Sequence, residues 1–380
     1  MKQISPQKPS TLHTWSIRMV ESTLQRYTLD DALWHYEHGL QVMAIQRAGQ
    51  VTGDERHLRF VADWIDRFVR ADGSIHTYRV DEYNLDQINA GKLLFGALER
   101  TDDERYRKAL DLLREQLRTQ PRTKSNGFWH KKIYPYQMWL DGIYMAGPFL
   151  AEYARRFDEP AIFEDVVRQI MLIEKHTRDE KSDLLFHAWD ESRQQRWCDP
   201  ATGRSRYFWG RGIGWFVMAL VDVLDHLPQL QPQRQDLIAM LERTARALVR
   251  VQDEETGLWY QILDLPAREG NYLEASASAM FVYAFAKGVR EGYLDPDYLF
   301  SARRGYHGLL QNLIRIDSQG LLTLEKVCGG AGLGGDPYRD GSFEYYVTEK
   351  IIPNDPKGVG PFILAALEME RAGVNGKLAE

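Results

Sequence analysis

One helical pattern recurs six times along the chain and limits the fold more than any other feature of the sequence. Each copy begins with an aromatic or charged residue, continues with small residues at helical spacing and becomes a largely apolar helix. The copies begin near Trp34, Asp86, Asp141, Trp209, Glu274 and Lys357. A second, charged amphipathic helix follows each of the first five copies, at residues 56–70, 104–119, 161–177, 234–252 and 296–315. Because a helix that is apolar all round must be buried, the alternation predicts an inner and an outer layer of helices.

The two ends of the chain indicate how these layers close. The sixth apolar helix, near Lys357, has no amphipathic helix after it, and the amphipathic segment 11–27 has no apolar helix before it. Pairing these two segments completes a ring of six inner and six outer helices. An open α-solenoid is the alternative arrangement for repeated helical hairpins, but it leaves both end helices without a partner. We therefore expect an all-α, closed (α/α)6 barrel that forms a single catalytic domain over residues 1–380.

The long loops share one position relative to the inner helices. Each of them comes directly before an apolar helix, at residues 72–84, 124–139, 181–208, 255–272 and 318–355. They are therefore expected at one end of the barrel, with short strands within 256–263 and 319–327. The 10 tryptophans and 19 tyrosines of the chain suit a pocket for ring-shaped ligands such as sugars. The sequence thus predicts an aromatic binding pocket at this end.

Composition excludes several classes of protein. The formal net charge of −6 argues against a nucleic-acid binder, which usually carries a basic patch. No apolar run approaches membrane-spanning length and no signal segment is evident, so we expect a cytoplasmic protein without a membrane partner. Cys198 and Cys328 lack metal-ligand spacing, and the glycine-rich segment 328–335 does not open a helix as a dinucleotide-binding loop does. No metal and no cofactor are expected.

Asp86 and Asp141 are the strongest candidates for chemistry. They occupy equivalent positions at the starts of consecutive inner helices, so both are expected at the mouth of the pocket. An acid at a helix start is often only an N-cap, which is the structural alternative for each of them. If they face each other, the pKa of one carboxyl rises through repulsion and burial, whereas the helix dipole favours the ionised form. The sequence leaves open which of the two carries a proton.

Two further motifs supply candidates for ligand binding. The segment HAWDES (187–192) places His187 in a loop before an inner helix, although a lone loop histidine is often incidental. In WGRGIGW (209–215), Arg211 is flanked by glycines and suits a ligand carboxylate, with Trp209 and Trp215 as walls. A salt bridge from Arg211 to Asp190 or Glu191 is the structural alternative.

Seven segments together resemble the unsaturated rhamnogalacturonyl hydrolases of glycoside hydrolase family 105, over about residues 30–370. They are YQMWLDGIYMAGPF, LDQINAGK, FHAWDES, WGRGIGW, SASAM, RDGSFEYY and NDPKGVGPF. The resemblance implies an (α/α)6 barrel that removes the unsaturated uronic acid left by pectin lyases at the non-reducing end of the chain. It implies Asp141 as the catalytic acid and Asp86 as its partner. It also places His187, Arg211 and His130 in the pocket as substrate-binding residues.

The chemistry that this resemblance implies is hydration of a vinyl ether. Asp141 protonates C4 of the substrate, water adds at C5, and the resulting hemiketal opens and expels the remaining sugar. No attack on the anomeric carbon is needed, in contrast to ordinary glycosidases. The expected ligand is a small acidic oligosaccharide, and the oligomeric state stays open.

Three alternatives remain at this point. The first is an unsaturated glucuronyl hydrolase that acts on glycosaminoglycan or ulvan fragments. The second is a sugar epimerase, which needs histidine pairs on inner helices, whereas His130 and His187 both lie in loops. The third is a non-catalytic oligosaccharide-binding protein.

Overall fold

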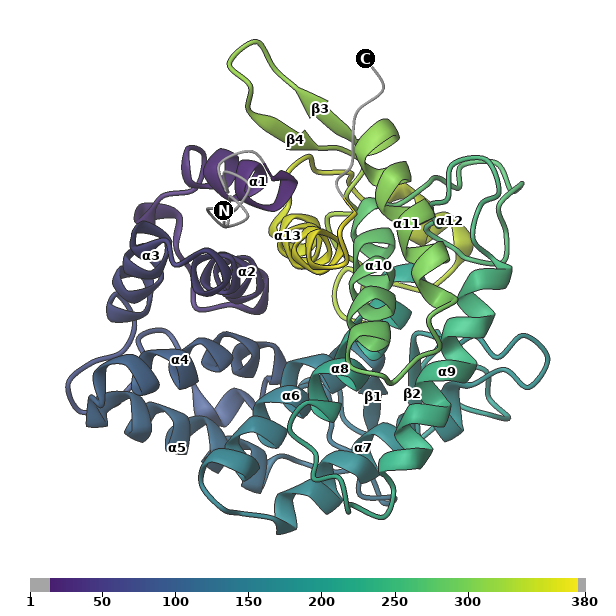
Figure 1. The fold of residues 1–380 in the computed structure, drawn as a ribbon. Helices are drawn as coiled ribbons and strands as arrows, with labels where there is room; N and C mark the ends of the chain where they lie inside the picture. The colour runs from purple at the N-terminus through teal and green to yellow at the C-terminus, as the bar shows by residue number, and fades with distance from the viewer. Residues whose placement is uncertain (1–13, 375–380) are drawn as a thin grey trace.

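The computed structural model describes residues 14–374 and shows two concentric rings of helices (Figure 1). The inner ring consists of α2 (Tyr36–Thr52), η4 (Leu85–Gly91) with α4 (Lys92–Thr101), α6 (Leu140–Arg156), α8 (Gly210–Leu224), α10 (Ala275–Arg290) and α13 (Pro356–Arg371). The outer ring consists of α1 (Trp15–Leu24), α3 (Glu55–Asp66), α5 (Glu104–Thr119), α7 (Ala161–Thr177), α9 (Arg234–Arg250) and α11 (Tyr298–Gly308). The predicted (α/α)6 barrel is confirmed.

The ring closes where the two ends of the chain meet. Helix α13 packs between α10 and α2 in the inner ring, and α1 covers α13 from outside. The carboxylate of Glu370 on α13 accepts hydrogen bonds from the backbone N–H and the hydroxyl of Ser16 on α1, at 2.9 and 2.6 Å. The predicted partnership of the first and last helices is therefore confirmed, although residues 11–13 of the predicted segment 11–27 lie outside the described residues.

Small residues allow the inner helices to approach closely. A Cβ added at Gly39 of α2 would lie 2.7 Å from the Cα of Ala90 in η4, which is backbone and cannot turn aside. We expect Gly39→Ala to lower the free energy of unfolding by about 1–3 kcal/mol through overpacking. Chemical denaturation measures this difference. Gly147→Ala is the matched control, because its Cβ would meet only Val223 at an ordinary 3.4 Å; an equal loss in both variants would contradict the packing argument.

Two predicted helices end earlier than the sequence indicates. The segment 56–70 is helical only to Asp66, since Val69 forms a β-bridge with Ile75. The segment 296–315 was predicted as one helix, and this is wrong: α11 is followed by a π-helical turn, η5 (Leu309–Leu313), and by strand β3 (Ile314–Ile316). Strand β3 pairs antiparallel with β4 (Leu322–Leu324). Pairing with this neighbouring strand replaces the helical hydrogen bonds of the last two residues of the predicted segment, Ile314 and Arg315.

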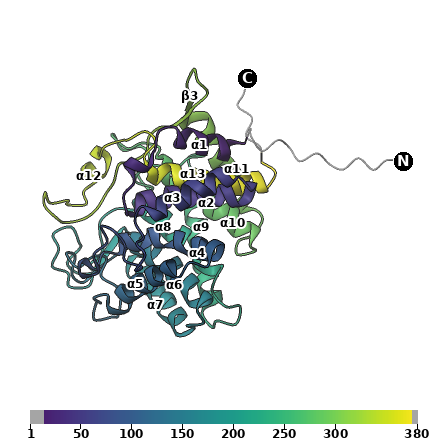
Figure 2. The same ribbon diagram turned by 90° about the vertical axis from the view of Figure 1, so that its left-hand side faces the viewer.

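The long loops gather at the end of the barrel where the inner helices begin. In the side view, α12 (Phe343–Thr348) lies on the left with these loops (Figure 2). Strand β1 (Gln137–Trp139) pairs antiparallel with β2 (Ala188–Asp190), with Met138 opposite Trp189, and so joins two of the loops. The strand expected within 256–263 is present only as isolated bridges, such as Tyr260 with Leu273. No helix among residues 14–374 is long and apolar enough to cross a membrane.

Candidate active site

A pocket opens among the loops at the start of the inner helices, with a volume of about 970 Å³ when the open space at its mouth is included. We call it the loop-end pocket. Asp86 and Asp141 both line it, as does His130. Aromatic rings form part of its wall, with Tyr134 stacked on Trp139 at 4.8 Å between ring centroids. The two acids singled out in the sequence therefore share one cavity with a stacking surface.

Neither acid serves as a helix cap. Trp139 is the N-cap of α6, which leaves Asp141 in the first turn of the helix, and Asn84 caps η4 by accepting a hydrogen bond from the N–H of Asp86 at 3.0 Å. Both carboxylates are thus free of the backbone role that would explain them structurally. The structural alternative raised by the sequence is excluded for Asp86 and Asp141.

Asp141 contacts a histidine from the neighbouring loop. Its Oδ2 lies 3.1 Å from Nε2 of His187, and its side chain is 13% exposed. Pairing of β1 with β2 and a hydrogen bond from the N–H of Leu140 to the carbonyl of His187, at 3.0 Å, hold the two residues in register. The His187 ring is fully buried and packs on Trp209 at 4.5 Å. Asp141 is therefore a partly exposed carboxyl with one fixed imidazole partner.

Asp86 has different partners, and they set its charge state. Its Oδ2 lies 2.5 Å from Nζ of Lys131, and its Oδ1 lies 3.5 Å from Nε2 of His130. Burial alone raises the pKa of Asp86, but the Lys131 ammonium, with His130 beside it, outweighs burial and lowers this pKa to about 2. Asp86 is consequently a carboxylate at neutral pH.

Lys131 gives a direct test of this charge assignment. We expect Lys131→Met to raise the pKa of Asp86 by about 1–3 units, because an adjacent cation favours the ionised carboxyl and its removal does the opposite. Carboxyl ¹³C NMR titration of the two proteins measures the change. Lys132→Met is the matched control, since Nζ of Lys132 contacts the carbonyl of Asp81 rather than Asp86. An unaltered titration of Asp86 in the Lys131 variant would show that the ion pair does not set its charge.

His130 is neutral at neutral pH. Burial lowers its pKa to about 4 against the opposing attraction of Asp86, and its ring stacks on Trp139 at 4.6 Å. Its Nδ1 is buried without a hydrogen-bond partner among the described residues. His130 is thus a neutral ring in the pocket wall beside Asp86, and its contact with a ligand stays a prediction.

The structure places Trp209, Arg211 and Trp215 behind the loop-end pocket. Each is at most 1% exposed. Trp209 supports the His187 ring, and Trp215 packs edge-on against Tyr36, which lines the pocket, at 6.1 Å. Direct ligand contact by these three residues stays a prediction. Of the contacts named for Trp209 and Trp215, only that of Trp215 with Tyr36 reaches a residue that lines the pocket.

Arg211 is engaged by protein groups on α10 and on the last long loop. Its Nε donates to the hydroxyl of Ser276 at 2.8 Å, its Nη2 donates to the carbonyl of Cys328, and it lies 3.5 Å from Oε1 of Glu274. Its Nη1 is buried without a hydrogen-bond partner among the described residues. A salt bridge therefore exists, with Glu274 as the acid.

The two acids considered from the sequence as partners of Arg211 have other roles. Asp190 accepts hydrogen bonds from the backbone N–H groups of Ser192, Gln194 and Gln195. Glu191 accepts from the N–H groups of Lys124 and Ser125. Both acids therefore organise the loops around β2.

Several pocket residues were not identified from the sequence. Lys131 is adjacent to His130 and belongs to the same loop, whereas Arg339 comes from the RDGSFEYY segment (339–346). Gly329 and Gly330 also line the pocket. These residues all lie in the long loops that precede inner helices, and this position alone marks them as candidates for the pocket.

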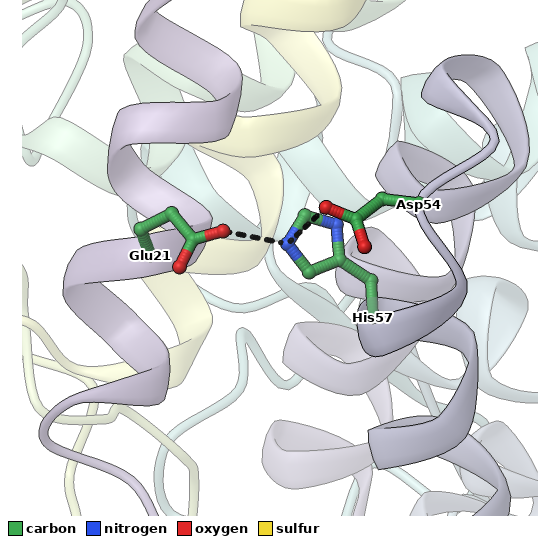
Figure 3. A group of neighbouring side chains, drawn as sticks. All are labelled: Glu21, Asp54 and His57. Atoms are coloured by element: carbon green, nitrogen blue, oxygen red, sulfur yellow. Dashed lines mark hydrogen bonds and ion pairs between the residues drawn. The ribbon is translucent and has the colours of Figure 1, made fainter. Parts of the chain in front are cut away.

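One group of residues outside the loop-end pocket has the composition of a metal site. His57 lies with Nε2 3.0 Å from Oε1 of Glu21 and 3.9 Å from Oδ2 of Asp54 (Figure 3). Nη2 of Arg56 contacts both carboxylates, at 2.8 and 2.7 Å. Because this guanidinium already bonds to both acids, we assign the group to joining α1 and α3. The residues of the loop-end pocket offer no comparable set of ligands among residues 14–374.

Comparison with known proteins agrees with this architecture. The family model described as Glycosyl Hydrolase Family 88 matches residues 15–373. A solved family 105 glycoside hydrolase from Clostridium acetobutylicum is 46% identical, with a TM-score of 0.92 over 94% of this chain and 100% of that chain. Protein Atu3128 of Agrobacterium fabrum is 40% identical over 232 residues, which are 59% of this chain and 97% of that protein.

More distant relatives share the fold or part of the sequence. The unsaturated rhamnogalacturonyl hydrolase YesR of Bacillus subtilis is 28% identical over 268 residues, covering 69% of this chain and 72% of YesR. An unsaturated glucuronyl hydrolase specific for heparin has a TM-score of 0.69 at 14% identity, over 97% of this chain and 98% of that chain, which is a likeness of fold alone. The family match over residues 15–373 and the barrel with its acid-lined pocket agree: the chain belongs to Glycosyl Hydrolase Family 88 and is a glycosidase related to the unsaturated glycosyl hydrolases of family 105.

Proposed function

We propose that the protein removes a 4,5-unsaturated galacturonyl residue from the non-reducing end of rhamnogalacturonan oligosaccharides. The observation that carries this proposal is the unequal setting of the two acids in the loop-end pocket. Asp86 is held as an anion by Lys131, whereas Asp141 is bonded to an imidazole that can accept or donate a proton. One carboxyl is therefore available to carry a proton, and the other remains ionised.

This asymmetry supports hydration of the C4–C5 double bond. Asp141 donates its proton to C4, which leaves a cation at C5 that the ring oxygen shares. Asp86, held as an anion by Lys131, is a weak base and stabilises this cation by its charge. Water adds at C5 and returns a proton to Asp141. The C5 hemiketal opens to a ketone, and the hemiacetal left at C1 releases the remaining sugar as an alcohol.

The walls of the loop-end pocket suit an acidic sugar. Arg339 donates to three neutral oxygens, the carbonyl of Gly334 at 2.9 Å, the hydroxyl of Tyr134 at 2.7 Å and the carbonyl of Leu333 at 3.4 Å. Its charge, together with that of Lys350 on the same wall, favours a ligand carboxylate. The stacked rings of Tyr134 and Trp139 offer a flat surface for a sugar ring.

The choice of rhamnogalacturonan rests on sequence relatives. The named activity of YesR and the seven segments listed above support it. An unsaturated 3S-rhamnoglycuronyl hydrolase of Formosa agariphila is also 28% identical, over 164 residues that are 41% of each chain, so the sugar next to the unsaturated residue is what an experiment must decide.

Incubation with defined disaccharides tests the proposal. We expect loss of the ultraviolet absorbance of the double bond, and release of rhamnose, from an unsaturated galacturonyl-rhamnose. A hexosamine-linked unsaturated disaccharide is expected to react far more slowly. Faster turnover of the hexosamine substrate would assign the protein to the glucuronyl hydrolases. Binding of both sugars without turnover would make it a carbohydrate-binding protein.

A further inference from the structure

Asp141 is the first member of a hydrogen-bonded chain that continues away from the loop-end pocket. Its Oδ2 lies 3.1 Å from Nε2 of His187, and Nδ1 of the same ring lies 2.8 Å from the hydroxyl of Tyr346. His187 and Tyr346 are both 0% exposed. The imidazole therefore has a protein partner on each nitrogen and no access to solvent.

Tyr346 is held firmly in this position. It lies on α12, and its ring stacks on Trp209 at 6.0 Å. Gln261 donates from Nε2 to the carbonyl of Tyr346 at 3.0 Å and accepts from the indole N–H of Trp209 at 3.2 Å. The same side chain thus fixes the backbone of Tyr346 and the ring beneath it. The position of the hydroxyl is consequently set by Gln261 of the loop 255–272 and by Trp209, the N-cap of α8.

With a neutral imidazole, the donors and acceptors in this chain allow two arrangements. When Asp141 is ionised it only accepts, so Nε2 carries the proton of a neutral His187 and Tyr346 donates to Nδ1. When Asp141 is protonated on Oδ2 and donates to Nε2, Nδ1 carries the proton and donates to the oxygen of Tyr346. A hydroxyl is required for both, because it is a donor and an acceptor. Burial raises the pKa of Tyr346 well above its ordinary value, so the hydroxyl keeps its proton.

We propose that Tyr346 is a positioning residue whose hydroxyl lets His187 support Asp141 in its protonated form as well as in its ionised form. This inference rests on the proposed function, in which Asp141 gives a proton to C4 and recovers one from water. The two arrangements differ by that single proton. Tyr346 touches no substrate atom in this account and acts on the reaction through His187.

Other titratable groups around the pair differ from Tyr346 in their partners. They are Tyr36 on α2, Asp86 on η4, His130 and Lys131 before β1, and Arg211 on α8. Asp86 pairs with Lys131, and Arg211 pairs with Glu274. None of these is the hydrogen-bond partner of His187. The effect of the Tyr346 hydroxyl is therefore separable from theirs.

Tyr346→Phe tests the inference by removing one oxygen. The variant removes the partner of Nδ1 in both arrangements, but it leaves a buried N–H donor unpaired only when Asp141 is protonated. An unpaired buried N–H is the costlier loss, so the protonated form is disfavoured. We expect the alkaline limb of the kcat profile to move to lower pH by about one unit, with kcat near neutral pH falling about tenfold. KM is expected to stay the same. Tyr306→Phe is the control, because Tyr306 is equally buried and its hydroxyl has no hydrogen-bond partner among the described residues.

The same substitution in a His187→Gln protein distinguishes a positioning role of Tyr346 from a general loss of stability. Adding Tyr346→Phe to His187→Gln is expected to change the pH profile no further, since the imidazole through which the hydroxyl acts is gone. A uniform loss of kcat without a change in the profile, or the same shift in both backgrounds, would overturn the inference.

A measurement without substrate distinguishes this inference from the proposed function. Carboxyl ¹³C NMR, with the Asp141 signal assigned through Asp141→Asn, is expected to show this carboxyl titrating at lower pH in Tyr346→Phe than in the wild type. An unshifted signal would refute the inference whatever the substrate is. A shifted signal in a protein that turns over no unsaturated disaccharide would support the role of Tyr346 and contradict the proposed function.

Discussion

Asp141→Asn is expected to fold as the wild type does and to lose turnover by about 10²–10⁴-fold, because general acid catalysis contributes a factor of this size. The amide has the same shape as the carboxyl and keeps a hydrogen-bonding atom for Nε2 of His187, which lies 3.1 Å from Oδ2 in the wild type. It has no acidic proton to place on C4. The loss should therefore appear in kcat, with substrate binding retained.

Steady-state kinetics on the unsaturated galacturonyl-rhamnose measures this loss, and thermal melting checks the fold. Asp199→Asn is a suitable control, because Asp199 accepts hydrogen bonds within its own turn, from Ala201 and Thr202, and does not line the loop-end pocket. Turnover at the wild-type rate in Asp141→Asn would eliminate Asp141 as the acid and transfer that role to another pocket group.

Arg211→Ala is expected to lower the free energy of unfolding by about 3–5 kcal/mol, because it leaves a buried carboxylate without its partner. Glu274 is 0% exposed and lies 3.5 Å from the guanidinium, which also donates to Ser276 and to the carbonyl of Cys328. These contacts join α8, α10 and the last long loop. Chemical denaturation followed by circular dichroism measures the difference.

A double variant provides the control for this stability prediction. Arg211→Met combined with Glu274→Gln removes both charges, and we expect it to be more stable than Arg211→Ala, since no buried charge is left unpaired. Arg211→Ala could instead unfold at the same denaturant concentration as the wild type and lose only affinity for an unsaturated uronate. That result would show that Arg211 contacts the ligand, as its motif indicated, and would contradict the stabilising role.

The ring of helices could be predicted because it follows from local patterns. Apolar and amphipathic segments alternate, and each inner helix start is marked by small residues such as Gly39 and Gly360, whose missing Cβ atoms allow close approach to Ala90 and Leu40. These features depend on residues a few positions apart. The positions of Asp86 and Asp141 followed from the same repeat, since equivalent helix starts meet at one end of a barrel.

The supporting contacts could not be predicted because they join distant parts of the chain. Tyr346 meets His187 across 159 residues, and the carbonyl of Cys328 meets Arg211 across 117. Which loop folds back over which helix start depends on packing such as that of α12 on Trp209. For the same reason, the sequence identified Arg211 as a cation near the pocket but did not reveal Glu274 as its partner.

Isotopic labelling tests the central claim, which is hydration of the double bond with Asp141 as the proton donor. In heavy water we expect deuterium at C4 of the released keto acid, and in ¹⁸O-labelled water we expect the label at C5, both read by NMR and mass spectrometry. A saturated galacturonyl-rhamnose should bind and remain intact. Label at C1 with C4 unexchanged would show attack at the anomeric carbon and would contradict the mechanism.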